Sequence, residues 1–388
     1  MQGGGRVRIG IVAGEASGDL IGSHLVEGLR RLLPEAEFLG IGGPRMQAAG
    51  VQSLYPMEKL SVRGLVEVLD NLREILTIRR ALIRRFIEDP PDLYVGVDAP
   101  DFNLGVEAKL RAAGIPTVQY VGPAVWAWGM HRVEKVKRSV DRLLSIFPFE
   151  PAIYEQAGVP VTYVGHPLAD MIPENPDREA TREQMRLPLD VPVVALLPGS
   201  RRAELKYMAD LFVNTARILH ERVPGIRFLV PLVTRETRSM FEEALFRNNA
   251  QELPIALLFG HAQDAMTAAD GVIAASGTAT LEAALLKRPL VITYKLASLT
   301  WWISRRKAYT PWVGLPNILA GEGLVPEFLQ DDATPENLAG ALISMVSDER
   351  RMRRLEERFS EIHQMLRRNT AEQAALAVLP LIEKRLAA

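Results

Sequence analysis

The sequence predicts an α/β protein made of two doubly wound halves of similar size. Short, fully apolar runs alternate with amphipathic helical stretches, which is typical of a parallel sheet covered by helices on both faces. The alternation lapses once, over residues 170–192, where four prolines and many charges indicate a linker. At about 100–200 residues per domain, a chain of 388 residues accommodates two domains. We therefore expect one α/β domain over residues 1–170 and a second over residues 190–365.

The elements of the first half follow from its apolar runs. A helix is predicted over residues 20–33, after a buried first strand and a glycine-rich turn. Strands are predicted over residues 7–13, 92–97, 117–121, 142–147 and 161–164. In such sheets ligands lie beyond the carboxyl ends of the strands, so polar residues at those ends are the candidates for function.

The second half repeats the pattern. Strands are predicted over residues 193–197, 227–230, 255–259, 271–275 and 290–293, and helices over residues 203–222 and 237–248. A further helix over about residues 366–388 either packs back on the first half or exchanges with another subunit. The sequence leaves both arrangements, and hence a homodimer, open.

Composition excludes several classes of protein. Lysine and arginine number 46 against 47 acidic residues, and this balance argues against a dedicated nucleic-acid binder. The absence of cysteine excludes disulfides, thiolate metal sites and a cysteine nucleophile. The longest charge-free run, residues 112–130, contains several glycines and prolines, so we expect no membrane-spanning helix. No signal peptide is expected at the N-terminus either.

Two turns in the second half suit an anion. Gly199, Ser200 and Arg201 follow one predicted strand, where glycine admits a close approach and arginine offers a fork of donors. The run Ser276, Gly277, Thr278 follows another strand and opens a helix, with Glu282 one turn further on. Helix N-termini attract phosphate, and Glu282 could reach the hydroxyls of a ribose. Each turn alone also fits an ordinary helix cap, but the pair favours a nucleoside diphosphate site.

Acidic residues follow two strands of the first half. The segment GEASGD (14–19) resembles a phosphate loop in shape only, since neither GxGxxG nor GxxxxGK[ST] is present. Its acidic residues suit a hydroxyl-rich ligand, or Asp19 serves as a helix cap. In VDAPDFN (97–103), Asp98 and Asp101 end another strand. One of these two is a candidate general base and the other a helix cap.

Aromatic residues form a second feature of the first half. Trp126 lies in the loop YVGPAVWAW (120–128), which predicts either core packing or a binding wall. His166 ends the last predicted strand of this half, where a buried structural histidine and a ligand-contacting one are both possible. No cluster with metal-ligand spacing is present, so we expect no tightly bound metal.

Together these segments resemble the lipid A disaccharide synthase family of inverting glycosyltransferases. The matching segments run in order over most of the chain: GEASGD (14–19), SVRGLVEVL (61–69), VDAPDFN (97–103), YVGPAVWAW (120–128), PFE (148–150), YVGHPL (163–168), LLPGSR (196–201), ASGTATLE (275–282), TYK (293–295) and LPNILAG (315–321). The resemblance implies the GT-B fold, two Rossmann-like domains facing a cleft, with the acceptor on the first and the UDP-sugar on the second.

The resemblance also implies a reaction and roles. UDP-2,3-diacylglucosamine would be joined to the 6-hydroxyl of 2,3-diacylglucosamine 1-phosphate (lipid X), giving a β(1→6)-linked disaccharide 1-phosphate and UDP without metal or cofactor. Asp98 would be the general base, Arg201 would stabilise the leaving diphosphate, and Asn317 would be a further catalytic polar group. The remaining assignments place Gly199, Ser200, Ser276, Gly277, Thr278 and Glu282 in the UDP site, and Glu15, Ser17, Trp126 and His166 near the acceptor.

Two regions predict attachment to a membrane surface. Apolar residues from Leu65 to Phe86 recur at roughly helical spacing beside Arg73, Arg79, Arg80, Arg84 and Arg85. Docking of this stripe on the sheet is the alternative, but Val66 and Ile78 fall off the stripe and would stay exposed. A second cluster joins aromatic and basic side chains: Trp301, Trp302, Arg305, Arg306, Lys307, Tyr309 and Trp312. We expect a cytoplasmic protein held peripherally on the anionic cytoplasmic face of the inner membrane.

Two rival functions remain at this stage. One is a GT-B transferase or epimerase acting on a water-soluble sugar nucleotide, which would show no lipid dependence. The other is a catalytically inert sugar-nucleotide or lipid-binding protein, in which Asp98→Ala would change nothing except stability.

Overall fold

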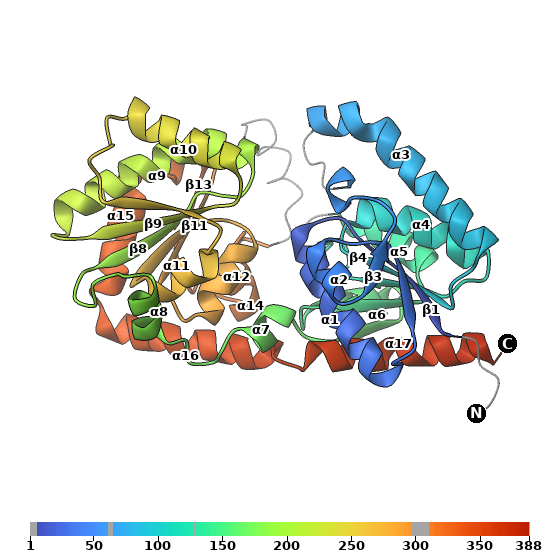
Figure 1. Ribbon diagram of the computed structural model, residues 1–388. Helices are drawn as coiled ribbons and strands as arrows, with labels where there is room; N and C mark the ends of the chain where they lie inside the picture. The colour runs from blue at the N-terminus through green and yellow to red at the C-terminus, as the bar shows by residue number, and fades with distance from the viewer. Residues whose placement is uncertain (1–5, 61–64, 128, 297–309, 388) are drawn as a thin grey trace. The chain divides into compact units, whose positions relative to one another are not determined.

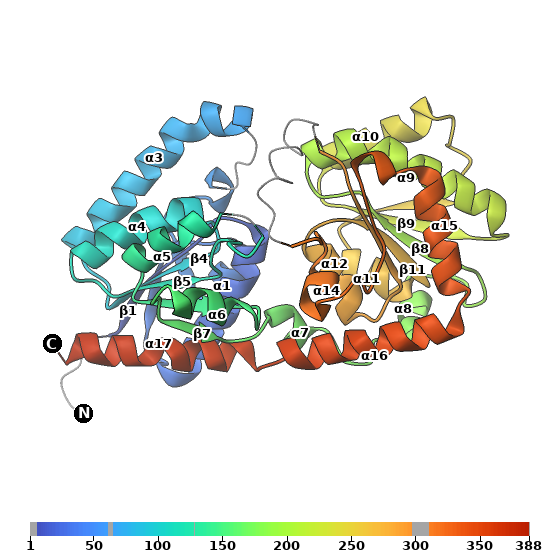
Figure 2. The same ribbon diagram turned by 180° about the vertical axis from the view of Figure 1, so that it is seen from behind.

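The computed structural model describes residues 6–60, 65–127, 129–296 and 310–387, and for residues 65–71 the helical backbone alone. The chain divides into two compact units. Unit 1 comprises Met1–Asp170 and Met365–Ala388, and unit 2 comprises Met171–Gln364. Each contains a parallel sheet with helices on both faces, which confirms the predicted α/β class (Figures 1 and 2).

The described part of unit 1 holds a seven-stranded parallel sheet in the order β3-β2-β1-β4-β5-β6-β7. Its strands are β1 (Arg8–Ala13), β2 (Glu37–Ile41), β3 (Val51–Ser53), β4 (Leu93–Val97), β5 (Thr117–Tyr120), β6 (Arg142–Ser145) and β7 (Val161–Tyr163). The five predicted strands of this half are present. Strands β2 and β3 were not predicted. β3 has three residues, two of them polar, and β2 begins with Glu37 and has Gly40 within its apolar run.

Helices cover both faces of this sheet (Figure 1). One layer contains α3 (Leu65–Glu88), α4 (Pro100–Ala112) and α5 (Val133–Ser139), and the other contains α1 (Ala16–Leu32) and α17 (Thr370–Leu386). Shorter elements are α2 (Pro44–Ala48), η1 (Met57–Lys59), η2 (Met130–Arg132), α6 (Glu150–Gln156) and α7 (Pro167–Met171). In this chain α17 packs back on α1, so closely that a Cβ on Gly28 would lie 2.1 Å from the carbonyl oxygen of Ala371.

Helix α3 docks part of its apolar stripe on the sheet. Ile78, Leu82 and Phe86 are buried in the core of unit 1 with Tyr94 of β4. The expectation that Ile78 stays exposed is therefore wrong: its side chain is 6% exposed, because positions 78, 82 and 86 follow one another at four-residue intervals on one face. Leu72, nearer the start of the helix, is 39% exposed.

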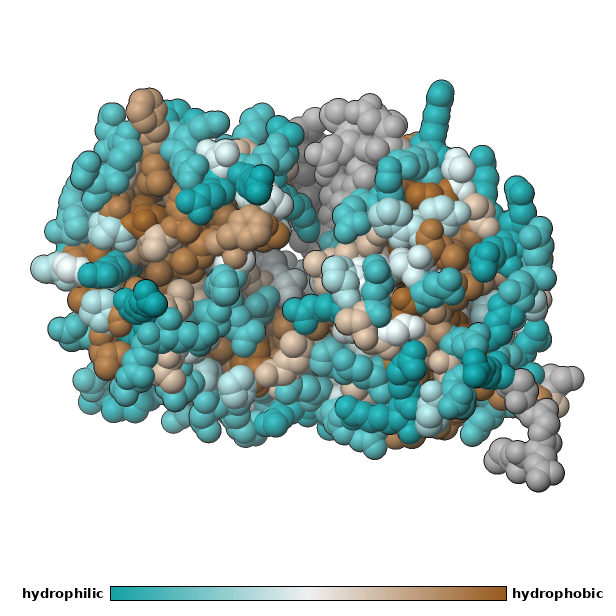
Figure 3. All heavy atoms as spheres, in the orientation of Figure 1, coloured by the Kyte–Doolittle hydropathy of each residue, from teal (hydrophilic) through white to brown (hydrophobic). Residues whose placement is uncertain are grey.

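The described part of unit 2 holds a six-stranded parallel sheet in the order β10-β9-β8-β11-β12-β13. Its strands are β8 (Val193–Leu197), β9 (Arg227–Leu232), β10 (Ile255–Phe259), β11 (Gly271–Ala275), β12 (Leu290–Tyr294) and β13 (Glu327–Leu329). Only β13, a three-residue strand, was missed by the sequence analysis. The edge strand β10 lies at the surface, where apolar residues form a brown area in Figure 3, and Phe259 is 61% exposed.

The helices of unit 2 form two layers. One contains α9 (Arg202–Arg222), α10 (Arg235–Arg247) and α15 (Pro335–Val346), and the other contains α8 (Arg178–Gln184), α11 (Ala262–Ala268), α12 (Thr278–Leu285) and α14 (Leu315–Ala320). The 3-10 helix η3 (Gln330–Asp332) follows β13, and α16 (Glu349–Leu366) leads towards α17.

The segment expected to be a linker, residues 170–192, instead contributes a helix to unit 2. Helix α8 packs on α11, and Arg182 is almost fully buried. The Arg182 guanidinium donates to Asp270 Oδ2 at 2.7 Å and to the carbonyl oxygens of Ala268 and Leu189 at 2.8 and 2.9 Å. An arginine that is buried and paired cannot be distinguished by residue type from one in a solvated linker. The charge and proline content of residues 170–192 therefore did not reveal this helix.

Candidate functional site

In each unit the strand order reverses at one point, and the predicted site residues lie there. The reversal falls between β1 and β4 in unit 1, and between β8 and β11 in unit 2. Ligands of doubly wound sheets bind beyond the carboxyl ends of the two strands at such a point. Glu15 and Asp98 follow β1 and β4, whereas Ser200 and Ser276 follow β8 and β11. The topology therefore brings together, within each unit, segments that lie about 80 residues apart.

Asp98 is the first residue after β4 and has an unusual backbone. Its φ is 52°, in the left-handed region that non-glycine residues rarely adopt. The carboxylate is partly exposed, and Oδ2 accepts a hydrogen bond from the hydroxyl of Ser17, at the start of α1, at 3.4 Å. The Asp98–Ser17 contact confirms that the turns after β1 and β4 share one location.

The carboxylates of Asp19 and Asp101, near Ser17 and Asp98 in sequence, contact other groups of the protein. Asp19 is buried, and its oxygens accept from the backbone N–H groups of Arg45 and Met46, so it caps α2 rather than facing a ligand. Asp101 lies in the first turn of α4, forms an ion pair with Arg132 and has a side chain 86% exposed. Of the two aspartates that the sequence could not distinguish, Asp98 is the one beside Ser17.

The aromatic loop after β5 forms a half-buried cluster. Trp126 meets the rings of Phe147 and Phe149 edge-on, with centroid distances of 6.2 and 5.3 Å. His166 lies 5.8 Å from Phe147, centroid to centroid, but it is buried, and its Nδ1 accepts from the backbone N–H of Leu168 at 3.2 Å. Burial lowers the pKa of His166 to about 4. His166 therefore has a structural contact at the start of α7, and its contact with the acceptor stays a prediction.

Glu150 is a buried carboxyl in the same cluster that the sequence analysis did not single out. It opens α6, and its Oε2 accepts from the backbone N–H of Phe147 at 3.2 Å. Burial raises the pKa of Glu150 to about 7, although hydrogen bonds from the Phe147 and Ile146 backbone and from the Trp126 side chain oppose the shift. Its sequence signals are the family-matching segment PFE (148–150) and its position shortly after the predicted strand 142–147.

In unit 2, Glu204 in the first turn of α9 caps the turn after β8. Gly199 has a φ of +115°, and a Cβ there would lie 2.5 Å from Oε2 of Glu204. That oxygen accepts from the backbone N–H groups of Ser200 and Arg201 at 2.9 and 3.2 Å. Glu204 Oε1 lies 3.4 Å from the Arg201 guanidinium and 3.4 Å from the hydroxyl of Tyr294. The Glu204 carboxylate thus accepts from the two backbone N–H groups of this turn, whereas the Arg201 side chain is 45% exposed.

The second predicted anion turn lies at the start of α12. Ser276 donates its hydroxyl to the carbonyl oxygen of Val313 at 3.0 Å, Gly277 precedes the helix, and Thr278 begins it. Glu282 follows after one turn. Burial raises the pKa of Glu282 to about 7, and its carboxylate makes no hydrogen bond or ion pair with the other described residues. A partly buried carboxylate without a protein partner is suited to accept from ligand hydroxyls.

The expected catalytic polar group Asn317 makes its hydrogen bonds within unit 2. It is fully buried in α14, where its Nδ2 donates to the carbonyl oxygen of Val325 at 2.9 Å and to Glu327 Oε1 at 2.7 Å, while its Oδ1 accepts from Val325 N at 2.9 Å. Glu327 in turn accepts from the backbone N–H groups of Val313 and Gly314. Glu327 thereby connects Asn317 to the segment whose Val313 carbonyl accepts the hydrogen bond from Ser276.

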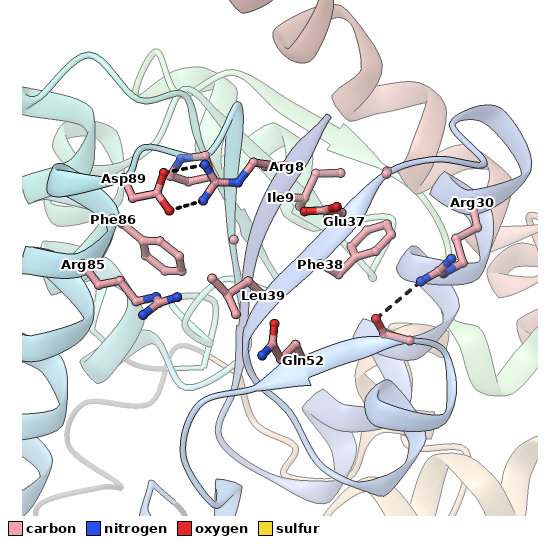
Figure 4. A pocket seen from close by; sticks show the side chains of 14 residues that line it. Arg8, Ile9, Arg30, Glu37, Phe38, Leu39, Gln52, Arg85, Phe86 and Asp89 are labelled. Carbon is pink, nitrogen blue, oxygen red and sulfur yellow. Dashed lines mark hydrogen bonds and ion pairs between the residues drawn. The ribbon is translucent and has the colours of Figure 1, made fainter. Parts of the chain in front are cut away.

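A separate pocket of about 480 Å³ lies at the amino ends of β1 and β2, away from these residues (Figure 4). Arg8 donates to both carboxylate oxygens of Asp89 at 2.5 Å, and Arg30 donates to the carbonyl oxygen of Ala49 at 2.8 Å. Arg8 and Arg30 therefore already have hydrogen-bond partners within the protein. None of the predicted site residues lines the pocket.

The described residues contain neither a metal-binding cluster nor a membrane-spanning helix. No group of three or more histidine, aspartate or glutamate side chains within residues 6–60, 65–127, 129–296 and 310–387 is placed to hold a metal ion. None of the helices described is both long and apolar enough to cross a membrane. Six of the seven residues of the second aromatic-basic cluster, residues 301–309, lie outside the described residues.

The two units, each with a doubly wound parallel sheet whose strand order reverses once, give the chain a fold of the GT-B class. Solved structures agree: the chain superimposes on the UDP-GlcNAc 2-epimerase from Neisseria meningitidis with a TM-score of 0.63 at 11% identity, covering 98% of this chain and 100% of that one. Anabaena HepE, solved with UDP-glucose, gives a TM-score of 0.58 at 15% identity, covering 96% and 99% of the two chains. At these identities the likeness shows the fold alone.

Sequence comparison is more specific. The model of the lipid-A-disaccharide synthetase family matches residues 9–378. The lipid-A-disaccharide synthase of Dechloromonas aromatica is 57% identical over 377 residues, covering 97% of this chain and 99% of that protein, and that of Methylobacillus flagellatus is 54% identical over 375 residues, covering 97% and 99%. The chain belongs to the lipid-A-disaccharide synthetase family.

Proposed function

We propose that this protein is a lipid-A-disaccharide-forming glycosyltransferase. It transfers the 2,3-diacylglucosaminyl group of UDP-2,3-diacylglucosamine to the 6-hydroxyl of 2,3-diacylglucosamine 1-phosphate, and releases UDP. Family membership over residues 9–378 supports the reaction. The structural observation that carries the assignment is Asp98, a partly exposed carboxylate beside Ser17 at the reversal point of the unit 1 sheet.

Unit 2 binds the UDP part of the donor in this proposal. Glu282 accepts from the ribose hydroxyls, because its carboxylate is partly buried and makes no hydrogen bond or ion pair with other described residues. The diphosphate meets the backbone N–H groups at the start of α12 and the Arg201 guanidinium at the start of α9. The Arg201 side chain is 45% exposed, and its guanidinium lies 3.4 Å from Glu204, so it remains accessible to an anion.

Unit 1 supplies the base. Asp98 accepts the proton of the acceptor 6-hydroxyl as the oxygen attacks C1 of the donor from the side opposite UDP, which inverts the configuration in one step. Because a carboxylate is a weak base towards an alcohol, the proton moves late, when the new C–O bond is largely formed. The negative charge that develops on the departing UDP is stabilised by Arg201 and the helix N–H groups, without a metal ion.

The test follows UDP release from UDP-2,3-diacylglucosamine in detergent and EDTA, with and without the acceptor. We expect UDP release that depends on the acceptor, together with a disaccharide product. Asp98→Asn should lower kcat by about 10²–10⁴-fold, the usual contribution of a general base. Asp101→Asn is the matched control, since Asp101 lies three residues away and is exposed, and it should retain kcat. Equal activity in both variants, or UDP release without acceptor, would contradict the proposal.

We also propose that helix α3 holds the protein on the anionic cytoplasmic face of the inner membrane. Exposed Leu72 and Ile87 are accompanied by exposed Arg73, Arg80 and Arg84, and Figure 3 shows apolar and hydrophilic residues side by side along this part of unit 1. The protein should sediment with liposomes containing anionic lipid at low salt. Arg80→Glu with Arg84→Glu should release it, whereas Arg235→Glu on α10 should not. Equal binding to purely zwitterionic liposomes would refute the electrostatic part.

A further inference from the structure

The turn that carries Asp98 is strained, and so is the neighbouring turn after β5. Asp98 and Ala99 have φ values of 52° and 41°, and Val121 has a φ of 68°. A left-handed conformation is uncommon for aspartate and is an outlier for a β-branched residue such as valine. Each costs on the order of 1–3 kcal/mol and persists only where the surroundings enforce it.

Two buried amide side chains lie directly beneath these turns. Gln119 of β5 donates its Nε2 to the carbonyl oxygen of Asp98 at 3.0 Å and to that of Val121 at 2.9 Å. Asn103 of α4 donates its Nδ2 to the same carbonyl oxygen of Asp98 at 2.9 Å. Both side chains are fully buried, so water does not compete for these bonds.

Each amide is itself oriented. The hydroxyl of Tyr94, fully buried in β4, donates to Oδ1 of Asn103 at 3.0 Å, which fixes the direction in which Nδ2 points. The Oε1 of Gln119 has no hydrogen-bond partner among the described residues, so the interactions of that amide are those of its two N–H donors.

We infer that Gln119 and Asn103 are positioning residues, which hold the left-handed turn of Asp98 so that its carboxylate stays directed at the acceptor hydroxyl. Gln119 also fixes Val121, the first residue of the loop that carries Trp126, and so links the base to the aromatic loop. The inference rests on the proposed function, because it assumes that Asp98 is the base. A misplacement of a reacting group by about 1 Å can cost roughly 10²-fold in rate.

The test compares substitutions on one strand. Gln119→Met keeps the volume but removes both donors, and should lower kcat about tenfold or more while KM for the acceptor changes less than about twofold. Gln119→Glu should be intermediate, because burial favours the protonated carboxyl, which retains one donor. The matched control is Thr117→Val on the same face of β5: Thr117 is also fully buried, and its hydroxyl donates to the carbonyl oxygen of Ser139 at 2.9 Å, far from Asp98. It should lower the melting temperature but leave kcat unchanged.

The outcomes separate this inference from the proposed function. Wild-type kcat in folded Gln119→Met, or an equal loss of kcat in Thr117→Val, would overturn the inference. If Gln119→Met does not fold, the comparison of Gln119→Glu with Thr117→Val decides in the same way. Activity in Asp98→Asn refutes the proposed base itself, whereas an inactive Asp98→Asn beside a fully active Gln119→Met refutes the positioning role alone.

Discussion

Glu282 should make the binding of a UDP-sugar depend on pH near neutrality. Burial raises the pKa of its carboxyl to about 7 in the ligand-free protein, so the group is largely protonated at pH 6 and largely ionised at pH 8. The ionised carboxylate accepts hydrogen bonds from two ribose hydroxyls, and charge-assisted bonds of this kind are about twice as strong as neutral ones. Affinity should therefore rise as the pH rises through 7.

The magnitude follows from the ionised fraction. With a pKa of about 7, roughly a tenth of the carboxyl groups are ionised at pH 6 and roughly nine tenths at pH 8. If the sugar nucleotide binds only the ionised form, the Kd falls about tenfold between these two values, which is about 1.4 kcal/mol. A contribution from the protonated form would reduce the difference but not reverse its sign.

The assay is calorimetric titration with UDP-GlcNAc at pH 6, 7 and 8. This ligand is preferable to UDP because its diphosphate is a diester without a proton that titrates near pH 7. Glu282→Gln keeps the shape of the side chain and should abolish the pH dependence. Glu150→Gln is the matched control: Glu150 has a similar raised pKa but lies in unit 1, so this variant should keep the dependence. A flat affinity in the wild type, or the same slope in Glu282→Gln, would refute the reasoning.

Two further predictions concern stability. Glu150 has a pKa of about 7 in the folded protein against 4.5 as its ordinary value, so the folded state binds more protons between these pH values. The stability of the fold should therefore decrease as the pH rises from 5 to 8, by up to about 3 kcal/mol in urea denaturation, and Glu150→Gln should remove this decrease. A pH slope unchanged by this substitution would be inconsistent with the buried carboxyl. Arg182→Met should lower the free energy of unfolding by about 2–4 kcal/mol, because it leaves the carbonyl oxygens of Ala268 and Leu189 without their buried donor. Asp270 loses one of its partners but keeps Arg178 and the backbone N–H of Val193. A loss below about 1 kcal/mol in urea denaturation would show that the segment 171–189 behaves as a linker after all.

The sequence predicted the fold well because the relevant signal is local. Fully apolar runs such as residues 193–197 and 271–275 became β8 and β11, since a strand buried on both faces has no polar positions to obscure the pattern. Short edge strands carry little of that signal. β3 and β13 have three residues each, and backbone pairing with a longer neighbour defines them more than their own composition does.

The candidate site was harder to predict because its chemistry depends on contacts between distant segments. The sequence placed Asp98 and Ser17 at strand ends, and the topology brings those ends together. The sequence could not show that Asn317 forms hydrogen bonds with Val325 and Glu327, or that His166 is buried. A residue type and its neighbours in sequence do not determine burial.

The residues that sequence analysis passed over share one property. Gln119, Asn103 and Glu327 are polar side chains of the interior or its margin that donate to or accept from backbone groups next to the site. In a search for apolar runs such residues count as interruptions, yet each forms hydrogen bonds with a backbone segment at the site. Gln119 and Asn103 donate to the turn at Asp98. Glu327 accepts from the segment whose Val313 carbonyl accepts from Ser276. A polar residue near the carboxyl end of a buried strand, such as Gln119 in β5, is therefore a sequence signal for the support of a site, and the substitutions at Gln119 test whether that support governs the rate.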